Sequence, residues 1–111
     1  MLSKGNRLKK KEDFKLVFNK GKKIKGIFLY LKAVQNGLGE SRFGIIISKK
    51  VDKKATVRNL IKRRTRAVIK ENLPKIKTNI DCIVFFISLP ENFISLKKDI
   101  EECFEKLKPY V

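Results

Sequence analysis

The chain has 111 residues, 42% of them hydrophobic and 35% charged, a composition that predicts one folded domain over residues 1–111 whose ends, 1–6 and 108–111, need not be ordered. Its formal net charge of +17 makes a polyanion the expected partner, with nucleic acid ahead of an anionic membrane. No stretch has the length and apolarity of a membrane span or of a secretory signal, so those classes are excluded and a cytoplasmic protein is expected.

The first predicted element is a short helix over residues 10–21. Phe14, Val17 and Phe18 recur at i, i+3 and i+4, a spacing that places them on one face of a helix. An acidic pair near the start suits the positive end of the helix dipole, and Gly21 suits its end. The helix is therefore expected to pack by an aromatic face.

Strands are predicted next. Residues 26–34 and 42–48 are rich in β-branched and aromatic side chains, and the pair Asn36 and Gly37 between them is typical of a hairpin turn. We therefore expect these two segments to pair as antiparallel strands. A nearly continuous apolar run over residues 80–89 predicts a central strand that is covered on both faces.

Two further helices complete the predicted fold. Residues 55–72 have the pattern of a helix, which Pro74 ends. A helix that covers the sheet is predicted near the C-terminus from an amphipathic pattern of Leu96, Ile100, Cys103, Phe104 and Leu107. The order of helix, two or three strands, helix, strand and helix predicts an α+β fold, a small sheet with helices packed on it.

The positive charge is concentrated in one part of the chain. Residues 1–70 hold 22 of the 28 Lys and Arg residues but only four of the 11 acidic ones. Winding the predicted helix at about 100° per residue gathers one cationic arc: Arg58, Asn59, Lys62, Arg63, Arg66 and Lys70. The opposite arc is predicted to face the core, with Arg64 among its apolar residues and Ile69 on the charged side: Val57, Leu60, Ile61, Ala67 and Val68.

A solvated helix face is the usual explanation of such a charge run. Solvated faces mix charges of both signs, whereas these basic side chains stand one helical turn apart with no carboxylate near, which costs roughly a few tenths of a kcal/mol per pair. The repulsion indicates an anionic partner. Planar guanidinium groups beside the amide of Asn59 fit structured nucleic acid better than a lipid surface.

Tyr30 lies outside this helix, in the first predicted strand. Its side chain fits the core or a stack on an unpaired base equally well.

Catalysis by the protein itself finds little support in the sequence. The chain has no histidine, and its acidic residues show no spacing that would gather a metal-binding carboxylate site. Asp52 is expected to turn the loop before the basic helix. Cys82 and Cys103 lie in apolar patterns without metal-ligand spacing and are expected to be reduced core thiols.

Two stretches of the sequence resemble a known family. SKKVDKKATVRNLIKRRTR, preceded by FGIII, resembles the signature of the bacterial ribonuclease P protein family, in which a strand and two lysines lead through a loop to a basic helix. RLKKKEDFKLVFNKGKK resembles that family's opening, and the similarity spans residues 7–107. The resemblance implies an α-β-β-β-α-β-α sandwich with a left-handed crossover, although about 98% of such crossovers are right-handed.

The resemblance also implies roles for individual residues. Together with Lys70 of the cationic arc, the residues expected to bind RNA are Lys49, Lys50, Lys53, Lys54, Arg58, Asn59, Lys62, Arg63 and Arg66. A cleft for the 5′ leader of precursor tRNA is expected at Phe14, Phe18 and Tyr30. The chain departs from the family where Leu60 replaces the third residue of an Arg-Asn-Arg core, and our hypothesis is that Arg64 reaches toward the missing guanidinium group.

The implied function is that of the protein subunit of ribonuclease P. Such a subunit binds the catalytic RNA and the leader of precursor tRNA and assists the Mg²⁺-dependent removal of that leader, with Mg²⁺ bound mainly through the RNA. The expected partners are ribonuclease P RNA and precursor tRNA, with no membrane and no obligate protein partner. The alternatives are a ribosomal or other structural RNA-binding protein without a substrate cleft, and a polybasic protein of the membrane surface.

Overall fold

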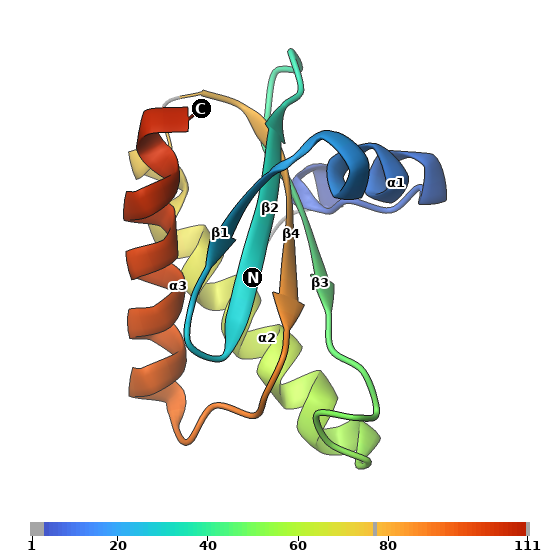
Figure 1. Ribbon diagram of the computed structural model, residues 1–111, viewed down its shortest axis with the longest axis vertical. Coiled ribbons are helices and arrows are strands. Elements are labelled where there is room, and N and C mark those ends of the chain that lie inside the picture. The colour runs from blue at the N-terminus through green and yellow to red at the C-terminus, as the bar shows by residue number, and fades with distance from the viewer. Residues whose placement is uncertain (1–3, 77, 111) are drawn as a thin grey trace.

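The computed structural model describes residues 4–76 and 78–110, and its elements follow the expected order (Figure 1). The helices and strands are α1 (Lys11–Lys20), β1 (Lys22–Lys25), β2 (Leu29–Gln35), β3 (Arg42–Ile46), α2 (Ala55–Asn72), β4 (Ile80–Phe86) and α3 (Phe93–Leu107). Short turns of 3₁₀ helix occur at η1 (Lys4–Asn6), η2 (Leu73–Lys75) and η3 (Lys108–Tyr110). The predicted bounds of the basic helix are confirmed. Of the ends that need not be ordered, residues 1–3 and 111 lie outside the described residues.

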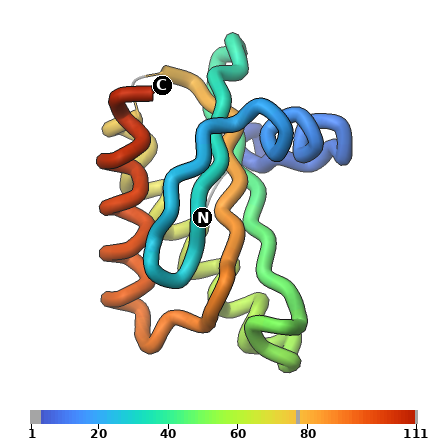
Figure 2. The backbone as a smooth tube through the Cα atoms, viewed as in Figure 1, coloured from blue at the N-terminus to red at the C-terminus, as the bar shows by residue number. Residues whose placement is uncertain are grey.

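Within the described residues the strands form one four-stranded mixed sheet in the order β1-β2-β4-β3. β4 pairs antiparallel with β2 and parallel with β3. The predicted hairpin of β2 with β3 is therefore wrong, because β4 lies between them and β1 is the other neighbour of β2. α2 connects β3 to its parallel neighbour β4, and Figures 1 and 2 show α2 behind the sheet. This crossover connection is left-handed, as the family resemblance implied.

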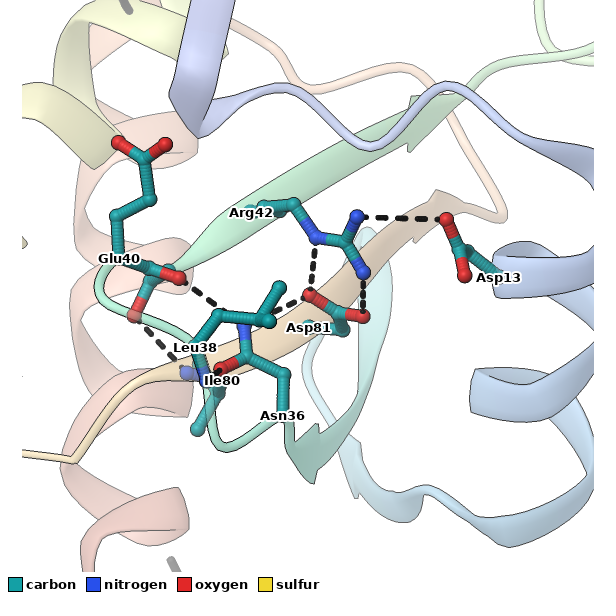
Figure 3. A network of polar contacts seen from close by, with 8 residues as sticks. Asp13, Asn36, Leu38, Glu40, Arg42, Ile80 and Asp81 are labelled. Carbon is teal, nitrogen blue, oxygen red and sulfur yellow. Dashed lines mark hydrogen bonds and ion pairs between the residues drawn. The ribbon is translucent and has the colours of Figure 1, made fainter.

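A polar network at the start of β4 explains why β2 and β3 do not pair (Figure 3). The Arg42 guanidinium binds both oxygens of the Asp81 carboxylate, from Nε to Oδ1 at 2.8 Å and from Nη2 to Oδ2 at 2.5 Å. The Asn36 amide donates to the same carboxylate at 2.9 Å. Gly37 does adopt the turn conformation, with a φ of 66°. The loop nevertheless folds onto β4, because Arg42 and Asn36 share one buried carboxylate on that strand.

The sheet separates two apolar clusters. On its inner face, which α2 and α3 cover, lie alternate residues of the strands: Leu29, Leu31, Phe43, Cys82, Val84 and Phe86. On its outer face, α1 packs through Val17 against Ile83. β4 is thus the covered central strand that the sequence predicts, although Phe85, on the outer face, stays partly exposed.

The buried side of α2 differs from the side that hydropathy predicts. Ile69, expected on the charged side, is 0% exposed, whereas Leu60, expected on the apolar side, is 37% exposed. Two polar residues lie on the buried side, Thr65 and Asn72, and each donates to the backbone oxygen four residues earlier, at 2.7 Å and 2.8 Å. Because the backbone of the helix accepts these hydrogen bonds, both polar side chains can face the core. The buried side of α2 therefore includes Thr65 and Asn72, which hydropathy alone does not predict.

Both cysteines occupy core positions. Cys82 and Cys103 are buried free thiols, as the sequence predicts. Burial raises the pKa of Cys103 to about 11. Burial likewise raises the pKa of Cys82, so both side chains are protonated and unreactive near neutral pH.

Candidate RNA interface

The basic interface begins in the loop before α2. Lys49, Lys50, Lys53 and Lys54 are all exposed there. Asp52 turns the loop as predicted, because its Oδ1 accepts from the backbone N–H of Lys54 at 2.8 Å. Arg58 fixes this loop to the helix, since its Nη1 donates to the backbone oxygens of Asp52 and Lys53 at 2.9 Å and 2.8 Å. Arg58 is therefore partly committed to the protein's own backbone, unlike the rest of the predicted cationic arc.

The remaining members of that arc form a continuous basic stripe along α2, away from its buried side: Asn59, Lys62, Arg63, Arg66 and Lys70. The ion pairs among the described residues lie elsewhere: Asp13 and Asp81 with Arg42, Glu71 with Lys97, and Glu105 with Lys108. None of the described carboxylates forms an ion pair with the stripe. Its charge therefore stays available to an external anion.

Arg7 adds a cation that sequence analysis did not single out. The residue forms a parallel bridge to Phe43 of β3, which brings the N-terminal segment to the open edge of the sheet. Burial first, and then the nearby charge of Arg7, lower the pKa of Arg66 from its ordinary value. The Nε of Arg7 is buried without a hydrogen-bond partner in the described structure. Arg7 therefore adds positive charge near Arg66 of the stripe.

The departure from the family motif lies on another side of α2. Leu60 and Arg64 are one helical turn apart and both exposed, and Arg64 lies near the start of α3. The Arg64 guanidinium carbon lies 5.7 Å from the centre of the Phe93 ring, a cation–π contact with the first residue of α3. Arg64 is thus held away from the stripe and beside the position of the missing arginine.

Aromatic side chains gather on the outer face of the sheet. The rings of Tyr30 and Phe85, opposite each other on β2 and β4, stack at 4.9 Å with an interplanar angle of 17°. Phe18 of α1 meets Phe85 edge to face at 6.2 Å. Burial raises the pKa of Tyr30, so its hydroxyl stays protonated at neutral pH. The structure therefore joins two predicted cleft residues through Phe85, which sequence analysis had assigned only to a buried strand.

Phe14, the third predicted cleft residue, packs over β3. A Cβ atom placed on Gly44 would lie 2.5 Å from the Phe14 ring, so only glycine allows this approach. The ring is partly buried in the outer apolar cluster. Phe14 thus anchors α1 to the sheet and presents only part of its ring to the outer face.

Lysines surround these rings. Lys32 of β2 donates from Nζ to the backbone oxygen of Phe18 at 2.9 Å, close to the negative end of the α1 dipole. Lys23 of β1 places its Nζ 4.5 Å from the centre of the Tyr30 ring. The outer face is therefore both aromatic and cationic, a combination that suits single-stranded nucleic acid.

Other kinds of site find no support in residues 4–76 and 78–110. No group of three or more His, Cys, Asp or Glu side chains there could hold a metal ion. None of the helices in that part of the chain has the length and apolar character to cross a membrane.

Comparisons with known proteins identify the family. The Ribonuclease P family matches residues 2–108. The chain is 34% identical over 111 residues to the ribonuclease P protein component of Pseudanabaena sp., covering 97% of this chain and 96% of the relative. It is 38% identical over 110 residues to that of Synechocystis sp., covering 95% and 87%. A Staphylococcus aureus RNase P protein mutant with defective mRNA degradation activity superposes with a TM-score of 0.87 at 27% identity, covering 95% of this chain and 90% of that one.

The RNase P protein from Thermotoga maritima superposes with a TM-score of 0.80 at 26% identity, covering 90% of this chain and 96% of that one. The chain therefore belongs to the ribonuclease P protein family. It is a protein component of ribonuclease P, a ribonucleoprotein endoribonuclease of tRNA processing. The predicted family and fold are confirmed, and the roles of individual residues stay predictions.

Proposed function

We propose that the chain binds the ribonuclease P RNA through the basic stripe and the 49–54 loop, and holds the 5′ leader of precursor tRNA on the aromatic outer face, in the cytoplasm. One observation carries the proposal: the described carboxylates leave the stripe unpaired, so its repulsion is relieved only by an external polyanion. The stripe and the 49–54 loop neutralise RNA phosphates, and the stacked rings contact unpaired leader bases.

In this proposal the phosphodiester chemistry belongs to the RNA subunit. The described residues offer no group of carboxylates or thiolates for a metal ion, so Mg²⁺ is assigned to sites on the RNA. The protein holds RNA and substrate together by charge and by stacking. A structural RNA-binding protein without a substrate cleft would not raise the cleavage of precursor tRNA by ribonuclease P RNA at low Mg²⁺, and this assay separates the two functions.

Replacing Tyr30 with alanine is expected to weaken substrates that carry a leader. The stack with Phe85 would lose one ring, and base stacking on an aromatic side chain contributes about 1–3 kcal/mol per base. The measurement is the Kd of the reconstituted ribonucleoprotein for precursor tRNA and for mature tRNA. Tyr30→Phe keeps the ring and serves as the control. An equal loss for both tRNAs would assign Tyr30 to the core and contradict the leader contact.

Replacing Arg64 with alanine tests the departure from the family motif. Because Arg64 lies one turn from Leu60, we expect it to supply the phosphate contact that the missing arginine would make. The affinity for the RNA subunit should fall about eightfold near 0.1 M salt, the effect of one phosphate contact. Phe93→Leu, which removes the ring but keeps the charge, should change affinity much less. Unchanged binding by Arg64→Ala would show that the cation–π contact is its only role.

A further inference from the structure

The edge strand β1 presents a lysine pair on the outer face of the sheet. Ile24 points to the inner core at 7% exposure, so its neighbours Lys23 and Lys25 project to the opposite side. In the strand register Lys23 is opposite Lys32, and Lys25 is opposite Tyr30. α1 packs against β2 and β4, and Figure 1 shows it on the β3 side of the sheet, away from β1. The lysine pair therefore borders the aromatic site.

The charges in this region are not balanced within the protein. Like charges directly opposite each other in neighbouring strands are unfavourable, and Lys23 faces Lys32 in this way. Lys32 is partly compensated, because it donates to the backbone oxygen of Phe18. Among the described residues no carboxylate forms an ion pair with Lys23 or Lys25. An external anion would relieve this repulsion.

The position of Lys23 restricts what can bind beside Tyr30. The Tyr30 ring has Phe85 on one side, at 4.9 Å, and the Lys23 ammonium near the ring, at 4.5 Å from its centre. Phe85 belongs to β4 and Lys23 to β1, on opposite sides of β2. A phosphate, rather than another stacked base, therefore suits the β1 side of Tyr30. Neighbouring β-strands lie about 4.8 Å apart, so β4 and β1 are separated by two such spacings. A single-stranded leader that runs across the sheet from Phe85 to β1 therefore covers roughly 10 Å.

Lysines on an edge strand have a simpler explanation, since they discourage pairing with another sheet. That explanation accounts for charge anywhere along β1. It does not require the two outward lysines to border a stacked aromatic pair, nor an ammonium group to lie at the Tyr30 ring. The two explanations also differ in what they predict about substrate length.

We propose that Lys23 and Lys25 bind backbone phosphates of leader nucleotides that lie beyond the Tyr30–Phe85 stack, so that the outer face of β1 extends the leader site. This inference rests on the proposed function, because it needs the leader on the aromatic face. It predicts that charge on β1 strengthens the binding of precursor tRNAs whose leaders are long enough to reach that strand. The basic stripe of α2 takes no part in this contact with the leader.

The test is a double variant, Lys23→Gln with Lys25→Gln, in the reconstituted ribonucleoprotein. The Kd of the variant and wild-type ribonucleoproteins is measured for precursor tRNAs whose leaders differ in length by one nucleotide. Each series is repeated at several salt concentrations. Wild-type affinity is expected for short leaders, and an affinity about 25-fold weaker near 0.1 M salt is expected once the leader reaches β1. For long leaders the salt slope should fall by about 1.4, the value for two phosphates of a single strand. Lys98→Gln with Lys106→Gln removes the same charge from exposed positions of α3 and serves as the control.

Three results would overturn the inference. An equal loss at every leader length, or weaker binding to the RNA subunit alone, would assign the lysine pair to the RNA subunit. No loss beyond that of the control would leave strand-edge protection as its role. If Tyr30→Ala shows leader dependence while the double variant does not, only this inference fails. If Tyr30→Ala shows none, the proposed leader site itself fails.

Discussion

Replacing Arg42 with alanine is expected to lower the free energy of unfolding by about 3–5 kcal/mol, since it leaves the buried carboxylate of Asp81 without its charged partner. Asp81 is 2% exposed and is bound by Arg42 through two hydrogen bonds. Without the guanidinium, the carboxylate would keep only the Asn36 amide as a side-chain partner within the described network. Asp13 of α1 would also lose its contact with Arg42, at 3.4 Å.

Urea denaturation followed by circular dichroism measures this loss. Lys108→Ala is the matched control, because it breaks an exposed ion pair with Glu105 and should cost at most about 1 kcal/mol. Combining Arg42→Ala with Asp81→Asn should recover part of the stability, since no unpaired buried charge is left. A loss from Arg42→Ala as small as that of the control would show that the Arg42–Asp81 pair does not hold the loop on β4.

The second large effect is expected from the basic stripe. Changing Lys62, Arg63 and Arg66 together to glutamine should weaken RNA-subunit binding roughly a hundredfold or more near 0.1 M salt, and lower the salt slope by about three. The fold should tolerate the change, because these side chains form no ion pair with a described carboxylate and Arg66 is held near another arginine. Filter binding over a salt series measures both quantities.

The control for the stripe removes equal charge from other positions. Lys75, Lys98 and Lys106 are exposed outside the stripe, and their triple change to glutamine lowers the net charge by the same amount. Its effect on affinity and on the salt slope should be small. Equal losses in the two triple variants would mean that net charge alone drives binding, and the stripe would not be a defined interface.

Local features of the sequence determined much of this protein. The helical period and Pro74 predicted α2 with its observed bounds, and the apolar spacing predicted the buried face of α3. These features depend on residues a few positions apart, which sequence patterns report directly. The density of Lys and Arg over residues 49–70 likewise indicated a polyanion partner, since net charge requires no knowledge of the fold. The motif around the basic helix indicated the family that the comparisons confirm.

Tertiary structure decided how distant segments meet. The turn at Asn36 and Gly37 looked like a hairpin, yet the Arg42–Asp81 pair, 39 residues apart in the chain, seats β4 between β2 and β3. The same sheet order brings Phe85 onto Tyr30 and separates Phe14 from that stack, and the bridge to Phe43 brings Arg7 near Arg66. Such contacts depend on pairings between remote residues, which local periodicity does not encode. The sequence therefore determined the helices, the central strand β4 and the charge, whereas long-range pairing determined the edge strand β1 and which side chains share a site.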